Sequence, residues 1–462
     1  GLGVGISFVT NRAPPPCVPK INWETIGTKV TQDVLRSGAE LASKAVLGRQ
    51  FGADVSLSSD GSRVAATGWF ASDGVAVYEM DATTQGWAQL GGDIAFNDTV
   101  FLKDEDEKQF NSSALVLSGD GQRLAVGRPF FSDDEADRRG MVIVYEYNDN
   151  DGDGDGGTWN PLGTPILGPK RSSMFGAAKT VDISEDGSIL AIGDLHHKKQ
   201  TGRVLVYKLV SRDWVEMGGA IQASNPGERF GVSISLSADG ATLAAGAVRY
   251  NDYAGQVRVF RYSEEEGAEE TEEEGTQEIG GNWAQVGEGI EGDLNRCEFG
   301  WPVVISPDGN RIVANSATFV EENGSCHPDD MDYIFFRGQV KVFEYAEESW
   351  AQVGSDIVPN EDDTNFGESL SLSGDGSVLA VSAWLEDTLY KMGGVTRVYH
   401  YDDSDWIQVG NDVTGTKTEA ETTGFALSLS YDGDVLAVGA PDNSEEVSGQ
   451  GGFYVFNHTS TC

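Results

Sequence analysis

The chain has 462 residues, 39% of them hydrophobic, and carries 74 acidic against 32 basic residues, a formal net charge of −42. This charge disfavours nucleic-acid phosphates, and the sequence shows no basic patch that would reverse the effect. No apolar run approaches the roughly 20 residues that span a bilayer, so no membrane span is predicted.

The first predicted elements precede a long series of repeats. Residues 1–20 are predicted to form an N-terminal extension, and the following INWETIG, which contains Trp23, is typical of a strand. Apolar residues at helical spacing over 34–46 predict a short helix.

From Phe51 onward, one unit recurs. An aromatic residue, usually followed by Gly, opens an alternating strand that leads to an Asp-Gly turn. An apolar strand, a Gly-initiated alternating strand and a Trp-x-x-x-Gly element complete the unit. Period-two alternation predicts strands, and Asp-Gly predicts tight hairpins because Gly tolerates positive φ. The turns lie at Asp60, Asp120, Asp186, Asp239, Asp308, Asp375 and Asp432. The aromatic anchors are Phe51, Phe110, Phe175, Phe230, Phe299, Phe366 and Phe425.

The count of Trp-x-x-x-Gly elements predicts how the ring closes. Six follow the seven turns, and the seventh lies at the other end of the chain, at Trp23. Seven four-stranded units predict an all-β, seven-bladed β-propeller whose last blade is completed by the N-terminal strand. Such closure leaves no open sheet edge at that point. We therefore predict one propeller over 21–462, with acidic insertions near 149–157 and 264–278.

Cysteines and glycosylation sequons favour a secreted protein. The sequence starts at Gly1 without Met, as expected after removal of a signal peptide. Ring closure would bring Cys17 beside Cys462, and Cys297 and Cys326 lie in connections on one face, so we predict these two disulfides. Metal-binding cysteines are the alternative, although no Cys-x-x-Cys spacing supports them. The sequons are Asn97, Asn111, Asn323 and Asn457.

The Phe-Gly openings and VGAPDNSEEVSGQGGFYVF at 438–456 resemble the FG-GAP repeat of integrin α-subunit propellers and related extracellular proteins. The resemblance covers nearly the whole chain after about residue 20 and implies a seven-bladed, extracellular interaction propeller. Several FG-GAP repeats carry a calcium loop between their first two strands, which is reduced here to Ser-x-Asp-Gly. One carboxylate does not supply the six to eight oxygens that calcium takes, so those sites are not carried over.

The two faces of the predicted ring differ. The nearly uniform Ser-x-Asp-Gly turns share one face, the turn face, with the connections between third and fourth strands. The opposite face, the loop face, holds the variable connections between second and third strands and between blades. Binding residues concentrate on loops held by a rigid scaffold, so the loop face is the predicted binding face, and packing of the loops against the blade ends is the alternative. The candidate residues are Trp69, Phe70, Phe130, Phe131, His196, His197, Tyr250, Tyr253, Tyr333, Phe336, Trp384 and Tyr390.

Carboxylates suggest two further chemistries. Clusters on the loop face could hold a divalent cation, act as an acid/base pair on glycans, or be solvated loop charge. These clusters are 104–107, 133–135, 329–332 and 386–387. The run 149–157 begins like an EF-hand loop, with Asp149, Asp151 and Asp153, but has Asn160 where the bidentate Glu belongs. It is a weak calcium candidate, and no cofactor is required.

The leading prediction is a secreted or cell-surface, non-catalytic interaction or adhesion propeller that binds an extracellular protein or glycan within a larger assembly. No Walker loop, Gly-x-Ser-x-Gly elbow or HExxH motif is present, so no enzyme is predicted. The alternatives are a glycan-active enzyme with carboxylates at the channel mouth and a structural subunit that self-assembles. Two carboxyl groups about 5–10 Å apart in a pocket would distinguish the enzyme.

Overall fold

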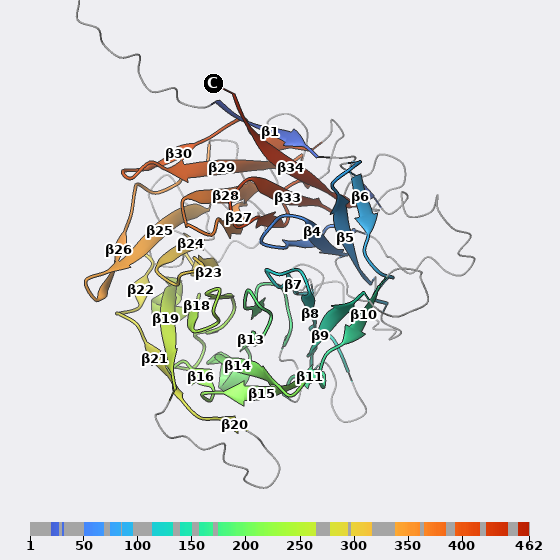
Figure 1. The fold of residues 1–462 in the computed structure, drawn as a ribbon. Coiled ribbons are helices and arrows are strands. Elements are labelled where there is room, and N and C mark those ends of the chain that lie inside the picture. Colours follow the sequence, from blue (N-terminus) through green and yellow to red (C-terminus); the bar gives the residue numbers. More distant parts are fainter. Residues whose placement is uncertain are drawn as a thin grey trace, which may run out of the picture.

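The computed structural model is an all-β ring of seven antiparallel sheets, the blades (Figure 1). The structure describes residues 20–26, 30–31, 50–68, 74–84, 86–95, 113–132, 139–149, 157–169, 174–264, 278–293, 297–316, 338–360, 365–384, 393–415, 422–441 and 451–461. Within these ranges no helix is long and apolar enough to cross a membrane. The predicted helix at 34–46 lies outside them.

The blades follow one another in chain order. Blade 1 contains β3 (Asp54–Leu57), β4 (Arg63–Thr67), β5 (Val75–Asp81) and β6 (Gly86–Gln89). Blade 2 contains β7 (Leu115–Leu117), β8 (Arg123–Arg128), β9 (Met141–Asn148), β10 (Thr158–Pro161) and β11 (Ile166–Leu167). Blade 3 contains β12 (Val181–Ile183), β13 (Ile189–Asp194), β14 (Arg203–Val210), β15 (Asp213–Met217) and β16 (Ile221–Gln222). Blade 4 contains β17 (Ile234–Leu236), β18 (Thr242–Ala247), β19 (Gln256–Ser263), β21 (Asn282–Gln285) and β22 (Ile290–Glu291).

The remaining blades repeat the arrangement. Blade 5 contains β23 (Phe299–Ile305), β24 (Arg311–Ser316), β25 (Gln339–Ala346) and β26 (Ser349–Gln352). Blade 6 contains β27 (Phe366–Leu372), β28 (Val378–Ala383), β29 (Val395–Tyr401), β30 (Trp406–Gln408) and β31 (Val413–Thr414). Blade 7 contains β32 (Leu427–Leu429), β33 (Val435–Ala440) and β34 (Gly452–Thr461), with β1 (Lys20–Thr25) and β2 (Val30–Thr31) from the N-terminal part. Two four-residue turns, α1 (His197–Gln200) and α2 (Tyr250–Tyr253), lie between strands of blades 3 and 4.

The ring closes as predicted. The innermost strands adjoin in the order β3, β7, β12, β17, β23, β27 and β32, and β32 returns to β3. The N-terminal β1 pairs antiparallel with β34, with Trp23 opposite His458, and forms the outer strand of blade 7. The first and last described strands therefore share one sheet, which confirms the prediction from the Trp-x-x-x-Gly count.

The Phe-Gly pairs lie where neighbouring blades meet most closely. The phenylalanines of five such pairs are 0–1% exposed. The glycine that follows lies against the backbone of the previous blade: a Cβ on Gly231 would lie 2.8 Å from the carbonyl oxygen of Arg203. These phenylalanines therefore belong to the hydrophobic core between blades, as predicted for large aromatic side chains.

One sequence-predicted anchor is wrong. In blade 7 the backbone of Thr423 packs against Gly394, as Phe366 packs against Gly338 one blade earlier. Thr423 and Gly424 thus hold the Phe-Gly position, and Phe425 is displaced toward the ring axis, where it is only half-buried. Residue type alone suggested the anchor, whereas the spacing to Asp432, seven residues instead of the usual nine, carries the correction.

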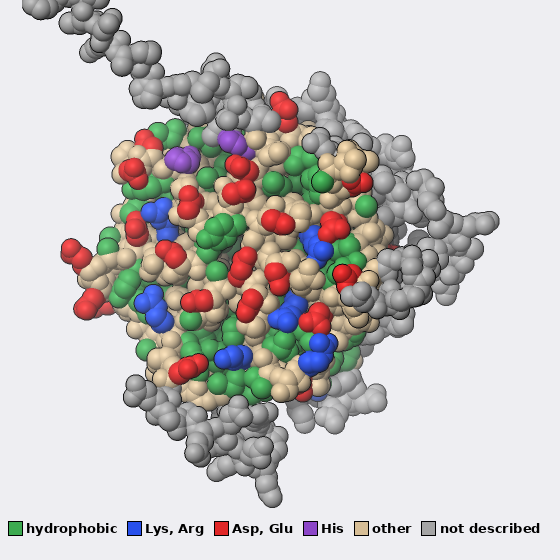
Figure 2. Space-filling model, in the orientation of Figure 1, with side chains coloured by type: hydrophobic (Ala, Val, Ile, Leu, Met, Phe, Trp, Pro, Cys, Tyr) green, Lys and Arg blue, Asp and Glu red, His purple; other side chains and the backbone are tan. Residues whose placement is uncertain are grey.

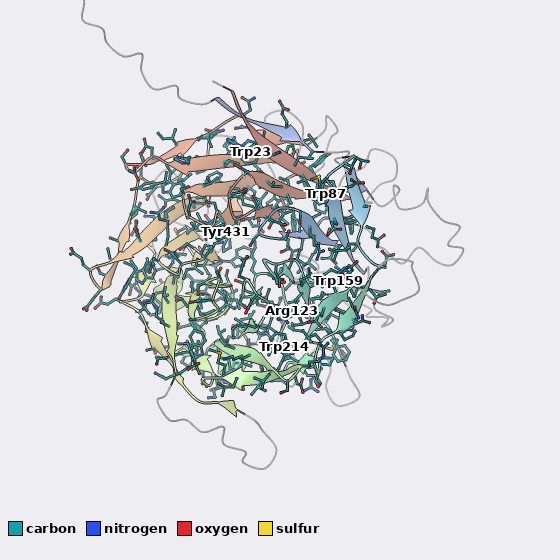
Figure 3. All side chains as sticks on the ribbon, in the orientation of Figure 1. Trp23, Trp87, Arg123, Trp159, Trp214 and Tyr431 are labelled. Atoms are coloured by element: carbon teal, nitrogen blue, oxygen red, sulfur yellow. The ribbon has the colours of Figure 1, made fainter. Side chains whose placement is uncertain are left out.

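The outer tryptophans of blades 2 to 6 bind each of these blades to the one before it. The indole Nε1 of Trp283 donates to the carbonyl of Met217 at 3.0 Å, and its ring covers Gly218. Trp159, Trp214, Trp350 and Trp406 repeat this bond, each to the residue that precedes the glycine of the previous blade. Figure 3 labels four of the tryptophans on successive blades around the ring. The Trp-x-x-x-Gly element is therefore an inter-blade contact in which both residues take part.

The carboxylates of the Ser-x-Asp-Gly turns accept hydrogen bonds from within their own turns. In blade 1 the Ser58 hydroxyl donates to Asp60 at 2.6 Å, and Ser62 N–H donates to the same oxygen at 2.9 Å. The serine-to-aspartate bond recurs in all seven blades. Partial burial raises the pKa of the Asp60 carboxyl, but the hydrogen bonds from Ser58 and Ser62 outweigh this effect and hold the pKa below its ordinary value. The Asp-Gly turns are structural, as predicted.

A ring of backbone hydrogen bonds joins these turns on the turn face. Ser59 N–H donates to the carbonyl of Gly119 at 2.8 Å, and the turns of six consecutive blade pairs are linked in this way. The link from blade 5 to blade 6 is missing because Pro307 stands at the donor position and has no N–H. Figure 3 places Tyr431 and Arg123, which belong to two of these turns, near the centre of the ring.

The second acidic insertion ends in an added strand. Residues Glu278–Ile279 form β20, which pairs in parallel with β15 of the preceding blade. Blade 3 consequently has six strands, with β20 outside β15, where the repeat unit predicts four. The added strand covers the backbone edge of β15, which would otherwise remain unpaired.

Cysteines and sequons are described only in part. Cys297 is 2% exposed and disulfide-bonded. Cys17, Cys326 and Cys462 lie outside the described residues, so both pairings stay predictions. Asn457 is exposed on β34, and the other three sequons are not described.

Candidate binding face

The structure describes seven of the twelve predicted loop-face residues. Trp69, Phe70, Tyr333, Phe336 and Tyr390 lie outside the described residues, as do all four acidic clusters. The same holds for Asp151 and Asp153 of the calcium candidate, while Asp149 is exposed just after β9.

Trp384 directly follows β28 and contacts residues in or beside the innermost strands. Its indole N–H donates to the carboxylate of Glu368, and its ring packs edge-on against Phe425 with centroids 5.1 Å apart. Asn365 donates to the same Glu368 oxygen at 2.8 Å. Trp384, Phe425 and Glu368 are each half-buried, so two aromatic rings from blades 6 and 7 are fixed in place yet remain partly accessible.

A lysine that the sequence did not single out crosses the axis. The ammonium of Lys179, at the start of blade 3, donates to the carbonyl of Glu368 in blade 6. The same ammonium lies 4.8 Å from the ring centre of Trp301 in blade 5, a cation–π distance. Burial lowers the pKa of Lys179, and the carboxylates of Glu368 and Asp54 oppose that change. Asp54, Lys179, Trp301 and Glu368 form what we call the axial cluster.

The carboxylates nearest the axis hold neighbouring blades together. Asp54 accepts from the N–H of Leu115 at 3.1 Å, and Asp182 accepts from the N–H of Leu236 at 2.7 Å. Serines do the same at other blade junctions, as Ser233 does for Val303. These side chains act as acceptors for inner-strand amides that would otherwise be unpaired.

Burial makes two of these carboxyls pH-sensitive. It raises the pKa of Asp54 from 3.8 to about 7 and that of Asp182 to about 6, against the opposing amide hydrogen bonds. Between about pH 4 and 7 these two carboxyls therefore bind more protons in the folded protein than in the unfolded chain.

We expect the free energy of unfolding to fall as the pH rises through this window. In the double variant Asp54→Ser, Asp182→Ser this fall should be smaller, because serine keeps an amide acceptor without a carboxyl to ionise. Urea unfolding at pH 4.5 and pH 7.5 measures the difference. An equal fall in both proteins would contradict the assignment.

Tyr250 and Tyr253 lie in an unusual turn. Asn251, Asp252 and Tyr253 all have positive φ, between 47° and 66°, and α1 in blade 3 repeats this conformation at 198–200. Three consecutive left-handed residues other than Gly are costly, about 1–2 kcal/mol each. The turn is held by the adjacent blade, since Glu298 N–H donates to the carbonyl of Tyr253 at 2.8 Å. Such strain is retained where the surroundings fix it, often at binding sites.

Guanidinium groups cover both tyrosine rings. Arg258 lies 5.3 Å from the ring centre of Tyr250, and Arg249 lies 5.2 Å from that of Tyr253. A hydrogen bond to Glu291 raises the pKa of the Tyr250 hydroxyl. Both rings are half-buried, so they combine an ordered position with accessible surface.

The histidines belong to a local polar group. His197 Nδ1 lies 3.8 Å from the carboxylate of Asp194, which is 0% exposed and pairs with Arg203 at 3.0 Å. Burial, and after it Arg203, lower the pKa of His197, while Asp194 opposes them. His196 is half-buried beside it. The pair therefore lies against a buried ion pair, and among the described residues no group of three or more potential metal ligands occurs.

The two phenylalanines of blade 2 are partly packed. The guanidinium of Arg128, 5% exposed, lies 5.7 Å from the ring centre of Phe131. Phe130 and Phe131 are half-buried where the chain leaves β8. This is the loop packing that sequence analysis kept as an alternative.

Sequence reasoning missed Lys179, Trp301 and Glu368, although a signal was present. Trp301, Glu368 and Phe425 directly follow a glycine of the Phe-Gly position, where other blades have small residues such as Ala53. Departure from the repeat at this one position marks Trp301, Glu368 and Phe425 in the sequence, but it does not mark Lys179.

No protein-family model matches this chain, and no curated protein matches it. Among solved structures, it resembles hydrazine synthase of Kuenenia stuttgartiensis at 15% identity, covering 92% of this chain and 99% of that chain, with a TM-score of 0.48. A putative 6-phosphogluconolactonase from Bacteroides fragilis matches at 16% identity over 79% of this chain and 85% of that chain, TM-score 0.48. The WD40 repeats of RRP9 match at 10% identity over 90% of this chain and 97% of that chain, with a TM-score of 0.49. Likenesses this distant concern the fold alone.

Proposed function

We propose that this chain is a secreted or cell-surface binding propeller, akin to FG-GAP proteins, that recognises a glycan or protein through its loop face. The observation that supports this best is the set of ordered, half-exposed aromatic rings on that side. Trp301, Trp384 and Phe425 come from three consecutive blades around the axis, and Tyr250 and Tyr253 belong to blade 4.

The turn face offers a contrasting surface. Its seven aspartates each accept a hydrogen bond from the serine of their own turn, so these carboxylates stabilise the turns. Figure 2 shows acidic side chains spread over one face of the ring with basic ones between them. Aromatic side chains with few rotatable bonds suit recognition better than dispersed charge does.

A glycan-active enzyme is supported less well. Two carboxyl groups would have to face a substrate about 5–10 Å apart. Asp54 and Asp182 point instead at the amides of the next blade, and the Glu368 carboxylate accepts from Trp384 and Asn365. These bonds leave the axial carboxylates in structural roles.

Replacing Trp384 by alanine tests the proposal. A glycan array supplies the ligand, and calorimetry measures its affinity. We expect Trp384→Ala to weaken binding by about 2 kcal/mol, as for an interface anchor. Trp384→Phe, which keeps the contact with Phe425 but lacks the N–H, should lose less.

Tyr431→Ala is the matched control, because Tyr431 is an aromatic residue 50% exposed on the turn face. It should bind as the wild type does. Full affinity in Trp384→Ala together with loss in Tyr431→Ala would place binding on the turn face and refute the proposal.

A further inference from the structure

Two arginines on the loop face lie close together, and neither forms an ion pair with a carboxylate among the residues that the structure describes. Arg229 precedes Phe230 in the connection to blade 4, and Arg249 follows β18 in the same blade. The Nε atom of each is buried and has no hydrogen-bond partner within the described part of the chain. Buried polar atoms are almost always paired, so each such atom needs an explanation.

Backbone bonds from adjacent blades hold the two side chains in place. Arg229 N–H donates to the carbonyl of Gln200 at 2.8 Å, and Arg249 N–H donates to that of Glu228 at 3.2 Å. The Arg249 guanidinium also donates to the side-chain oxygen of Gln200 at 3.2 Å and lies over Tyr253. The pair is therefore built into the junction of blades 3 and 4.

Other arginines of the chain show what is missing here. Arg258, close by, pairs with Glu228 at 2.9 Å, and Arg63 pairs with Glu79 at 2.9 Å. Within the described residues Arg229 and Arg249 have no carboxylate within 4.0 Å, although the chain has 74 acidic residues. Two neighbouring cations repel each other, and burial makes their repulsion less screened.

Glu298 is the acidic group that faces them. Burial raises its pKa, and the two arginines oppose that change from a distance without forming an ion pair. Burial also lowers the pKa of Arg229, with Arg249 as the next cause. The group thus has two cations against one carboxyl, an excess of positive charge within a strongly acidic chain.

We propose that Arg229 and Arg249 bind an oxyanion, a sulfate or carboxylate group carried by an acidic glycan. Guanidinium groups match both oxyanions with paired N–H donors. Tyr250 and Tyr253 lie beside the pair, each with a guanidinium over its ring, and the accessible part of these half-buried rings suits contact with a sugar ring. An acidic protein surface fits less well, because the net charge of −42 would repel it over a whole interface, whereas one acidic sugar meets only the local cations. This inference rests on the proposed glycan-binding function and names its ligand class.

The probes separate the two oxyanions. Calorimetry at constant ionic strength measures binding of inorganic sulfate, a sulfated heparin tetrasaccharide, a carboxylate-only hyaluronan tetrasaccharide and neutral chitotetraose. We expect at least one acidic oligosaccharide to bind roughly tenfold or more tightly than the neutral one. Arg229→Gln and Arg249→Gln should each weaken acidic binding roughly tenfold to a hundredfold.

Arg212→Gln is the matched control, since Arg212 is 69% exposed between β14 and β15, on the turn face, and pairs with Glu146. It should bind as the wild type does. Arg249→Lys keeps the charge but not the fork of donors, and should bind more weakly than the wild type. Thermal unfolding followed by circular dichroism establishes that each variant is folded.

Two outcomes separate this inference from the proposed function. If Trp384→Ala abolishes glycan binding while both Arg→Gln variants bind normally, the function stands and the anion site is refuted. If sulfate binding depends on Arg249 but no glycan binds, the anion site stands and glycan recognition is refuted. Equal binding of acidic and neutral oligosaccharides also overturns the inference.

Discussion

Replacing Phe230 by alanine is expected to lower the free energy of unfolding by about 3–5 kcal/mol, the usual cost of deleting a buried aromatic ring. Phe230 is 0% exposed and packs edge-on against Phe260 with ring centres 5.9 Å apart. Arg258 lies 5.7 Å from the same ring centre. The ring fills the junction between blades, so its loss leaves a cavity that rigid strands do not close. Urea unfolding followed by tryptophan fluorescence measures the change.

Phe425→Ala is the matched control for this prediction. The sequence gives both phenylalanines the same place in the repeat, but Phe425 is half-buried near the axis and Thr423 holds its blade junction. We expect Phe425→Ala to cost clearly less, about 1–2 kcal/mol, because part of the ring is already exposed to solvent. Equal losses in the two variants would show that the repeat, rather than the structure, places these residues correctly.

Replacing Lys179 by methionine is expected to destabilise the fold by about 1.5–3 kcal/mol, the usual range for a hydrogen bond that involves a charged group. Methionine keeps most of the volume but removes the cation that faces Glu368 and Asp54. It also removes the bond to the Glu368 carbonyl across the ring axis. Breaking one partner of a buried charged group is costly because the other is left uncompensated.

The double variant Lys179→Met, Asp54→Ser tests this explanation. Removing the Asp54 carboxyl together with the cation should recover part of the lost stability, an interaction that a double-mutant cycle measures. Lys199→Met, at an exposed lysine of the same blade, should change stability by less than about 0.5 kcal/mol. Strictly additive effects of Lys179→Met and Asp54→Ser would exclude electrostatic coupling between the two side chains.

The outer strands show how much a repeat can reveal. Trp-x-x-x-Gly predicted the fourth strand of every blade and the closure by Trp23. An isoleucine or valine also stands seven residues after each of these tryptophans, and sequence analysis overlooked it. It pairs with the third strand in every blade, as Val30 pairs with Phe453 in the last. The fourth strand is thus two short pieces that flank the glycine.

The arrangement of the binding-face residues was harder to predict from the sequence than the outer strands were, because it depends on three-dimensional placement. Trp384 was identified from its type, and the structure adds that Glu368 and Phe425 hold it in place. Lys179 escaped notice because two extra residues separate it from its Phe-Gly pair, so it does not align with Trp301 or Glu368. Only the closed ring brings residues from blades 3, 5 and 6 together.

The sequence by itself determined the strand periodicity, the turn chemistry, the number of blades and the closure by the N-terminal strand. These features follow from local spacing repeated seven times, and local spacing is visible in a single chain. The axial cluster and the approach of Arg229 to Arg249 were decided only by the tertiary structure. They arise from side chains 20 to 190 residues apart that meet because the ring closes, as Lys179 and Glu368 do at a separation of 189 residues. No periodic pattern encodes which side chains face one another across an axis.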